Sequence, residues 1–425
     1  MLRIFLVFLS INLFALNFTI NTLGECDKVC DNTVLIFGGI QGDEPGGFHA
    51  ASLLLTDYKI KKGKVIVVPN LAFDSIIARS RGEFGDLNRK FAELSENDPD
   101  YYTVALIKKI ITMPEIKLII NLHDGSGYYS PHYINKDKNP KKWGNSCIID
   151  QEVIDAKYGN LNEIADKACE NINKKLLHKL HSYHLKNTNT AKGDEEMLKS
   201  LTYYAITQGK AAYANEASKN LLTHERVYYH LLAIESYLEA AGIEFERSFE
   251  LNPKEVRNAI EKPILINLEN RFLLSLQKPR DRINFVPIKL PFNYKASNEL
   301  TAIFKSKNDN GYVVQYGNRF QTKLYLEKNV EYSDIINKLD LVVDGKEIST
   351  EFAKLIEVKK DFLVKKQENV RINIIGFNGK GSEDNIKLEL KNMQKQYSVD
   401  KAAKIYRIEA YEENKFIGAI LVKFI

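Results

Sequence analysis

Polar residues of the types that bind zinc follow two apolar stretches in the first third of the chain. Gln41 and Glu44 come directly after residues 34–40, and His123 comes directly after residues 118–122. A catalytic zinc ion takes three protein ligands and leaves a fourth position for water. If the two stretches are strands of one open sheet, their carboxyl ends meet at one edge, and the three side chains can converge on one ion. The alternative is that Gln41 and Glu44 cap the following helix while His123 hydrogen-bonds locally, and the spacing alone leaves both open.

A second segment, residues 79–91, contains three arginines and an asparagine. Asn88 and Arg89 can hold a carboxylate through charge-assisted hydrogen bonds. Arg81 can face a carbonyl oxygen on which negative charge develops. Glu216 stands at the end of a stretch of small residues and suits a general base for a metal-activated water if it is partly desolvated. For the arginines, a solvated basic loop is the alternative.

Together these residues resemble the motif set of the M14 zinc carboxypeptidase family over roughly the first 250 residues. That family has H-x-x-E, an arginine, an Asn-Arg pair, a later zinc histidine and a strand-end glutamate. The corresponding residues occur here in the same order: Gln41-x-x-Glu44, Arg81, Asn88-Arg89, His123 and Glu216. Gln41 departs from the family's first histidine, and because an amide oxygen is a weaker zinc ligand than imidazole, the metal affinity should fall. The same glutamine is a feature of the cell-shape-determining D,L-carboxypeptidases of helical bacteria, which this chain resembles most.

The resemblance implies a zinc-dependent hydrolase that trims the peptidoglycan tripeptide L-Ala-γ-D-Glu-meso-diaminopimelate to the dipeptide and contributes to cell shape. Its cofactor is Zn2+, and its partner is the peptidoglycan stem peptide. It implies these roles: zinc ligands Gln41, Glu44 and His123, general base Glu216, oxyanion partner Arg81, and carboxylate clamp Asn88 and Arg89.

Aromatic residues near these motifs are further candidates for the substrate site. Trp143 is the only tryptophan and lies in a basic loop after the His123 segment. It either forms a wall of the substrate pocket or packs in the core, and we assign it to substrate binding. The resemblance also implies a substrate-contacting tyrosine before Glu216, and both Tyr203 and Tyr204 remain candidates.

Two other functions compete with this interpretation. Succinylglutamate desuccinylase and aspartoacylase have the same kind of site and a stretch like Asp86-Leu87-Asn88-Arg89, but the signal-like N-terminus and the appended β-domains count against an intracellular deacylase. Alternatively, Gln41 marks a non-catalytic scaffold that binds peptidoglycan. A binding module has no need of a base such as Glu216 beside a metal site, which favours the enzyme.

The first part of the chain reads as an α/β domain, residues 23–262, which must position these groups. Continuous β-branched runs at residues 34–40, 65–68 and 118–122 predict buried strands of a mainly parallel sheet. Helical stretches alternate with them, at residues 47–58, 104–113, 151–185 and 221–241. The fold class is therefore α/β, and the family resemblance implies a zinc-carboxypeptidase-like mixed sheet flanked by helices.

After Pro263 the helical periodicity fades and short alternating strands take over. Turn dipeptides such as Asn310-Gly311 and Asp344-Gly345 separate these strands. We predict two small all-β domains, residues 263–342 and a β-sandwich-like domain at 343–425. The resemblance implies that they follow an exported catalytic domain, and proteins of a cell-shape complex are their candidate partners.

The start of the chain predicts export. A basic residue precedes an apolar run from Ile4 to Phe18, which suits a signal peptide or N-terminal anchor over residues 1–22 and a periplasmic protein. Four cysteines fit an oxidising compartment, and pairing between sequence neighbours, Cys26 with Cys30 and Cys147 with Cys169, is the simplest arrangement. The net charge of +5 is spread over 60 basic and 55 acidic residues, so no nucleic-acid partner is predicted.

Overall fold

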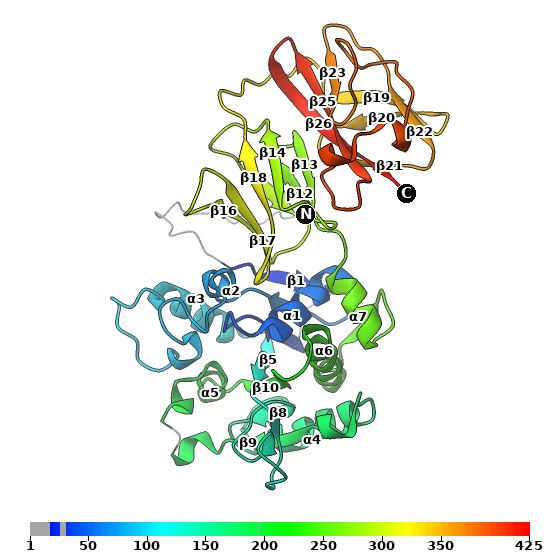
Figure 1. Cartoon of the computed structure of the whole chain (residues 1–425). Coiled ribbons are helices and arrows are strands. Elements are labelled where there is room, and N and C mark those ends of the chain that lie inside the picture. Colours follow the sequence, from blue (N-terminus) through cyan, green and yellow to red (C-terminus); the bar gives the residue numbers. More distant parts are fainter. Residues whose placement is uncertain (1–17, 26–30, 194) are drawn as a thin grey trace, which may run out of the picture. The chain divides into compact units, whose positions relative to one another are not determined.

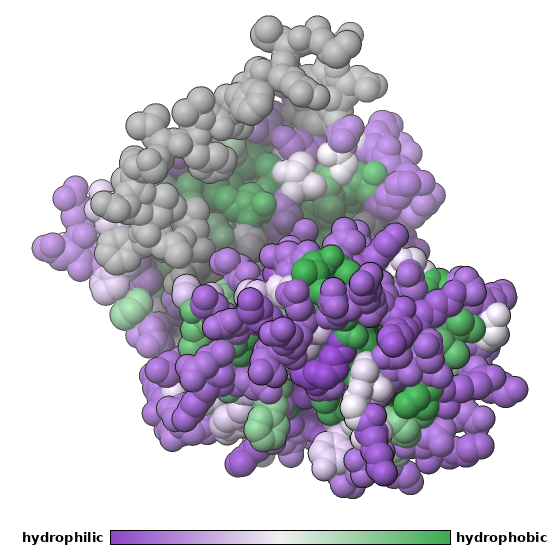
Figure 2. Space-filling model, turned by 90° about the horizontal axis from the view of Figure 1, so that it is seen from above, coloured by the Kyte–Doolittle hydropathy of each residue, from purple (hydrophilic) through white to green (hydrophobic). Residues whose placement is uncertain are grey.

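The computed structural model describes residues 18–25, 31–193 and 195–425, and the chain divides into two compact units at Glu261 and Lys262 (Figure 1). Most of the predicted signal segment lies outside the described residues, as do Cys26 and Cys30. Within the described residues, no helix is long and apolar enough to cross a membrane. Hydrophilic residues cover most of the face of the molecule seen in Figure 2.

The first unit is built on a seven-stranded mixed sheet with the strand order β1-β4-β2-β5-β10-β8-β9. Strands β4, β2, β5 and β10 run parallel, whereas β1 and β8 are antiparallel to their neighbours β4 and β10. The bounds are β1 Asn21–Leu23, β2 Thr33–Phe37, β4 Val65–Val68, β5 Ile116–Gly125, β8 Ser146–Ile149, β9 His184–Asn187 and β10 Ala211–Ser218. Two strand pairs stand apart, β3 Tyr58–Lys62 with β11 Glu244–Arg247, and β6 Tyr128–Tyr129 with β7 Lys138–Asn139.

Helices cover the central strands, so the predicted β-branched runs are buried along their length. Helix α1 packs against β2, β4 and β5, while α5 and α6 both pack against β5 and β10. The bounds are α1 Pro45–Asp57, α2 Phe73–Ala78, α3 Tyr101–Ile111, α4 Leu161–Asn173, α5 Leu201–Thr207, α6 Thr223–Ala240 and α7 Pro253–Ile260. The predicted α/β class and the three predicted strands are confirmed.

The helical periodicity predicted over residues 151–185 is wrong over much of its length. Only α4, Leu161–Asn173, is an α-helix there, and the chain then enters a short 3-10 turn and the strand β9. Leu177 and Leu180 look like part of the apolar helix face, yet they are 37% and 53% exposed. The helix ends because β9 pairs with β8 and extends the sheet, which satisfies the backbone groups of this segment.

The cysteines of the first unit also differ from expectation. Cys147 on β8 and Cys169 on α4 are free thiols, so the predicted disulfide between these neighbours is not present. Both are buried, and the Cys147 thiol donates to Asn215 Oδ1 at 3.9 Å. Burial and a hydrogen bond with Cys147 raise the pKa of the Cys169 thiol, and both buried side chains pack as small core residues.

The second unit consists of β-sheets, as predicted. The sheets have the orders β13-β12-β15, β14-β18-β17-β16, β20-β19-β22-β24 and β21-β26-β25-β23. The last two sheets share one core, in which Leu341 and Phe362 pack with Ile408 and Ile420. The division into domains at residue 342 stays a prediction, and β19 crosses that position.

The strands of the second unit are short, as their turn-rich sequence predicts. Their bounds are β12 Leu265–Leu268, β13 Phe272–Ser275, β14 Arg282–Val286, β15 Tyr294–Ala296, β16 Thr301–Lys305, β17 Tyr312–Tyr316, β18 Arg319–Leu326, β19 Lys338–Val343, β20 Lys346–Glu351, β21 Leu355–Val358, β22 Asp361–Val364, β23 Arg371–Ile374, β24 Leu388–Glu389, β25 Ile405–Glu412 and β26 Lys415–Phe424.

Candidate active site

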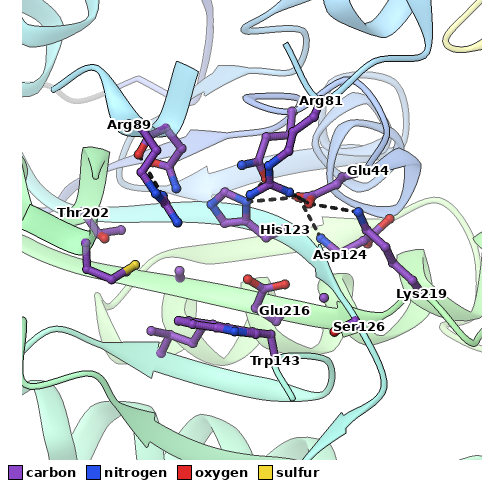
Figure 3. Close-up of a pocket in the computed structure, with 16 residues that line it drawn as sticks. Glu44, Arg81, Arg89, His123, Asp124, Ser126, Trp143, Thr202, Glu216 and Lys219 are labelled. Carbon is purple, nitrogen blue, oxygen red and sulfur yellow. Dashed lines mark hydrogen bonds and ion pairs between the residues drawn. The ribbon is translucent and has the colours of Figure 1, made fainter. Parts of the chain in front are cut away.

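A pocket of about 260 Å³ opens at the carboxyl ends of the parallel strands of the first unit (Figure 3). Its lining combines acidic, basic and amide side chains with the face of an indole ring. The eight residues to which the sequence analysis assigned a role line it: Gln41, Glu44, Arg81, Asn88, Arg89, His123, Trp143 and Glu216.

The pairing of β5 with β10 brings His123 and Glu216 together. His123 was expected after its strand, but β5 continues through Gly125, so His123 lies within it. The parallel register of β5 and β10 sets His123 directly opposite Glu216. Neighbouring residues across a sheet have their Cβ atoms about 5 Å apart, so this register alone places a metal-binding imidazole beside a carboxylate.

Gln41 and Glu44 come from the loop between β2 and α1 and turn toward His123. The Nδ1 atom of His123 is 3.1 Å from Gln41 Oε1 and 3.1 Å from Glu44 Oε2. Glu44 occupies the N-cap position of α1, but its side chain makes no capping hydrogen bond and instead accepts from the Asp124 amide at 3.0 Å. The alternative in which Glu44 caps the helix is therefore wrong.

The three donor atoms fit a zinc ion. Ligands about 2.1 Å from a tetrahedral zinc lie about 3.4 Å apart, close to the 3.1 Å separations of His123 Nδ1 from Gln41 Oε1 and Glu44 Oε2. The three side chains are buried, with exposed fractions of 2% to 5%. In the described part of the chain, no group of three or more His, Cys, Asp or Glu residues is arranged to hold a metal, so a triad here depends on the amide oxygen of Gln41.

Asp86 fixes the orientation of the Gln41 amide. Gln41 Nε2 donates to Asp86 Oδ1 at 2.8 Å, which turns Gln41 Oε1 toward His123. Burial opposes ionisation of Asp86, but the hydrogen bond from Gln41 and the charge of Arg81 outweigh it and hold the pKa of this carboxyl below its usual range. An ionised carboxylate only accepts hydrogen bonds, so the opposite amide orientation would place two acceptors together.

The same carboxylate positions two further site residues. Asp86 Oδ2 accepts from Arg81 Nε at 2.9 Å, and Asp86 Oδ1 accepts from the backbone amide of Asn88 at 3.0 Å. Asp86 thereby connects the candidate metal ligand Gln41 with the arginine-rich segment. Sequence analysis did not select Asp86, although it stood in the quoted Asp86-Leu87-Asn88-Arg89 stretch.

Arg81 lies at the edge of the pocket beside a candidate metal ligand. Its NH1 atom is 3.4 Å from Glu44 Oε1, and its side chain is 49% exposed. The guanidinium is therefore held by two carboxylates, Asp86 and Glu44, while about half of it faces solvent and the pocket. A fixed cation in this place can stabilise negative charge on an oxygen that develops next to the metal site.

Asn88 and Arg89 form a second group of donors in the pocket. Asn88 Oδ1 accepts from the Leu201 amide at 3.0 Å, which leaves its Nδ2 group as the donor for a ligand. Arg89 NH1 donates to the Asn88 carbonyl at 3.0 Å, and Arg89 Nε lies 3.6 Å from Glu196 Oε2. An amide N–H and a guanidinium side by side suit a carboxylate.

Glu216 lies at the centre of the pocket, between these groups (Figure 3). Its Oε2 atom is buried and has no hydrogen-bond partner among the described residues. Burial raises the pKa of the Glu216 carboxyl to about 8; the charge on His123 opposes the rise, and Glu44 and Asp124 add to it. An unpaired buried carboxylate oxygen with a raised pKa is typical of a group that exchanges protons with a reactant or pairs with a bound cation.

The electrostatics of the donor cluster favour a cation. Burial lowers the pKa of His123, but its hydrogen bond to Glu44 and the charges of Glu44, Glu216 and Asp86 outweigh burial and raise it. The raised pKa means that this cluster stabilises positive charge at the imidazole. A metal cation between His123, Glu44 and Gln41 would be stabilised by the same negative charges.

Behind the site, Asp124 anchors the end of β5. It is buried and accepts from the Gly46 amide at 2.8 Å, from Arg226 NH1 at 3.1 Å, and from His230 Nε2, with the two atoms 3.1 Å apart. Its own backbone amide donates to Glu44. These contacts tie β5 to α1 and α6, so Glu44 and His123 keep their relative positions.

Of the aromatic residues proposed for substrate contact, only Trp143 lines the pocket. The Lys186 ammonium lies 4.6 Å from the centre of its ring. Neither Tyr203 nor Tyr204 lines the pocket; Thr202, one residue earlier, does. The tyrosine predicted to contact substrate is therefore not brought to the pocket, because α5 presents Thr202 there instead.

Sequence comparison places the chain in a family. The family model described as a carboxypeptidase controlling helical cell shape, catalytic part, matches residues 1–261, and the one described as the C-terminal domain of a metallo-carboxypeptidase matches residues 332–425. The chain belongs to this family of cell-shape carboxypeptidases. No curated protein sequence matches it.

Solved structures agree with this assignment. The apo and the tripeptide-bound crystal structures of the cell shape determinant Csd4 from Helicobacter pylori are each 40% identical to the chain, with a TM-score of 0.86 over 96% of this chain and 100% of that chain. The mDAP-bound form of Helicobacter pylori Csd4, a D,L-carboxypeptidase, is also 40% identical, with a TM-score of 0.85 over 93% of this chain and 97% of that chain. The predicted resemblance to cell-shape carboxypeptidases is confirmed, and the chain is a carboxypeptidase of this fold.

We predict that Asp86→Asn lowers the zinc affinity of the protein by about 10- to 100-fold, because the Gln41 amide loses its acceptor-only partner. Zinc affinity can be measured by competition with a chromogenic chelator. Asp98→Asn is the matched control, since Asp98 pairs with Lys90 away from the pocket. Equal zinc affinities for the wild-type protein and Asp86→Asn would contradict the orienting role of Asp86.

We predict that the free energy of unfolding of the metal-free protein falls, relative to Glu216→Gln, as the pH rises from about 5 to 8. The pKa of Glu216 is about 8 in the folded protein and near 4.5 in the unfolded chain, so in this window only the folded state binds the proton. The difference should reach on the order of 4 kcal/mol at pH 8. Denaturant unfolding in the presence of a chelator measures it, and a difference that does not change with pH would show that the Glu216 carboxyl is not strongly desolvated.

Proposed function

We propose that this chain is a zinc-dependent D,L-carboxypeptidase that removes meso-diaminopimelate from the peptidoglycan tripeptide L-Ala-γ-D-Glu-meso-diaminopimelate. The observation that carries the proposal is the meeting of three elements in one pocket. These are a donor triad that fits zinc, an unpaired buried carboxylate at Glu216, and the carboxylate-binding pair Asn88 and Arg89.

The donor set supports zinc as the metal. One imidazole nitrogen, one carboxylate oxygen and one amide oxygen make a mixed set that is too rich in nitrogen for magnesium or calcium, which prefer oxygen ligands. When bound to Gln41, Glu44 and His123, zinc supplies Lewis acidity and lowers the pKa of water. The weakness of an amide ligand is offset in part by the ionised Asp86, which holds and polarises the Gln41 amide.

Asn88 and Arg89 determine where the substrate ends. Their donors bind the terminal carboxylate of the residue to be released, which lies one residue beyond the scissile bond. A further residue at the end of the stem peptide would occupy the place of this carboxylate and would remove its charge. The clamp therefore selects a tripeptide whose last residue is free.

Glu216 moves the proton in the reaction. As a carboxylate it accepts a proton from the attacking water, and as a carboxylic acid it donates this proton to the nitrogen of the leaving amine. Burial raises the pKa of this carboxyl in the metal-free site, which favours uptake of a proton there. Arg81 stabilises the negative charge that forms on the former carbonyl oxygen.

The relatives support the choice of substrate. The chain is 40% identical to Helicobacter pylori Csd4, which has been solved with a tripeptide and with mDAP bound. Arg81 and Arg89 give this pocket positive charge, and Asn88 adds an amide donor, which together suit an anionic peptide. A role in cell shape follows from the family to which the chain belongs.

We also propose that the protein acts in the periplasm. The apolar run Ile4 to Phe18 after a basic residue supports export, and the substrate is a cell-wall component. The β-sheets of the second unit are then available to proteins of a cell-shape complex. Fractionation of cells that express the full chain tests the location, and a purely cytoplasmic protein would contradict it.

The decisive experiment is digestion of purified muropeptides by the zinc-loaded protein, analysed by mass spectrometry. We expect disaccharide-tripeptide to lose diaminopimelate and leave disaccharide-dipeptide. Glu216→Ala should slow this reaction about a thousand-fold, because proton transfer is lost. Glu239→Ala, a change on the exposed face of α6, is the control. Tripeptide that survives intact with saturating zinc while still binding would instead favour a non-catalytic peptidoglycan-binding scaffold.

We predict that Arg89→Met weakens binding of meso-diaminopimelate by roughly 10- to 150-fold, because a hydrogen bond to a charged group is lost. Calorimetric titration of the zinc-loaded protein measures this binding. Arg79→Met is the control, because Arg79 is exposed and does not line the pocket. The same loss in both variants would mean that only overall charge matters and that Arg89 makes no specific contact.

A further inference from the structure

A third cationic side chain, Lys219, lines the pocket beside Arg81 and Arg89, and the reaction described above does not use it. Lys219 follows directly after β10, and its backbone amide donates to the Gly125 carbonyl at 2.7 Å. Its own carbonyl accepts from Arg226 NH2 at 3.0 Å. The backbone at Lys219 is therefore fixed to the ends of β5 and α6, and its side chain, 32% exposed, is directed to the pocket.

The Lys219 ammonium has donor capacity left for a ligand. Its Nζ atom lies 2.9 Å from Asp43 Oδ2 and 3.3 Å from Glu44 Oε1. An ammonium has three N–H donors, so these two contacts leave one for a further acceptor. The exposed Ser126 also lines the pocket on this side and adds a hydroxyl group.

Lys219 and Arg89 lie on opposite sides of the reacting centre. In Figure 3, Arg89 is at one side of Glu216 and His123, and Lys219 is at the other, next to Glu44. Under the proposed function, Arg89 binds the residue that leaves. The residue that provides the acyl group must then extend past the metal site in the other direction, toward Lys219.

The chemistry of the acyl residue requires a cation in that direction. A glutamate that is linked through its γ-carboxyl keeps a free α-carboxylate, four bonds from the scissile carbonyl carbon. At roughly 1.25 Å of extension per carbon–carbon bond, this places the carboxylate about 5 Å from the reacting carbon. A residue linked through its α-carboxyl has a carboxylate at this distance only if its own side chain is acidic, so most acyl residues bring no charge there.

The geometry points to Lys219, with Ser126, as a binding subsite for the free α-carboxylate of a γ-linked glutamate in the acyl position. This inference rests on the proposed function and deepens it. The pocket then binds the substrate by a carboxylate on each side of the scissile bond, at Arg89 and at Lys219. If the substrate carries an α-carboxamide in place of the α-carboxylate, the charge-assisted hydrogen bond to the Lys219 ammonium is lost.

The test compares two tripeptides that differ in one group. One carries the free α-carboxylate on D-glutamate, and the other carries an α-carboxamide at the same position. We expect the zinc-loaded wild-type protein to prefer the carboxylate at least about ten-fold in kcat/KM, and Lys219→Met to bring this ratio close to one. Lys219→Arg should keep most of the preference, since the charge remains.

The ratio of kcat/KM for the carboxylate and carboxamide peptides separates substrate recognition from other effects of Lys219→Met. If Lys219 only positions Glu44, then Lys219→Met lowers zinc content and the rates for both peptides together, and the preference survives; that outcome would overturn the inference. Lys186→Met is the matched control, because Lys186 lies over the Trp143 and Tyr129 rings. Loss of the preference in Lys186→Met rather than Lys219→Met would also overturn it.

Binding measurements keep this inference distinct from the proposed function. Calorimetric titration of the Glu216→Ala variant with the two peptides measures the preference without turnover. If the wild-type protein cuts neither peptide, the proposed function fails. If this variant still binds the carboxylate form at least about ten-fold more tightly, the subsite stands on its own, whereas equal binding of the two forms rejects it.

Discussion

The parallel pairing of β2, β5 and β10 is the constraint on which the rest of the site depends. Because the register of β5 and β10 sets His123 opposite Glu216, the imidazole and the carboxylate are neighbours before any ligand binds. The loop after β2 adds Gln41 and Glu44 at the same edge of the sheet. Asp124 then ties this edge to α1 and α6 through buried hydrogen bonds. Strands thus position His123 and Glu216, and the loop that carries Gln41 and Glu44 is anchored to the end of β5 by the Asp124 amide.

The use of glutamine as a metal ligand is consistent with its surroundings. A neutral amide is a poor ligand in isolation, and it can also turn its nitrogen to the metal. The ionised Asp86 prevents that by accepting from Gln41 Nε2, and the same carboxylate holds Arg81 and Asn88. One partly buried carboxylate therefore positions the candidate metal ligand Gln41, the arginine Arg81 and the candidate substrate-binding residue Asn88. The chain that carries this arrangement belongs to the family of carboxypeptidases that control helical cell shape.

The sequence predicted the parts of this protein that local patterns determine. Continuous β-branched runs identified β2, β4 and β5, and the polar residues after the first and third of these runs line the pocket. It did not predict what depends on contacts between distant segments. The role of Asp86 arises only when Gln41 is folded against it, and that of Lys219 only when β10 ends beside Gly125. Helical spacing after Asn173 was misleading because pairing of β9 with β8 overrode it.

The central claim is that zinc is held by one imidazole, one carboxylate and the amide of Gln41. X-ray absorption spectroscopy of the zinc-loaded protein tests this most directly, because imidazole rings and sulfur atoms give distinct scattering. The account predicts a shell of nitrogen and oxygen ligands at about 2.0–2.2 Å with the multiple scattering of a single imidazole and no sulfur. A second imidazole, or a sulfur ligand at about 2.3 Å, would contradict it, because the ion would then lie outside the pocket formed by Gln41, Glu44 and His123.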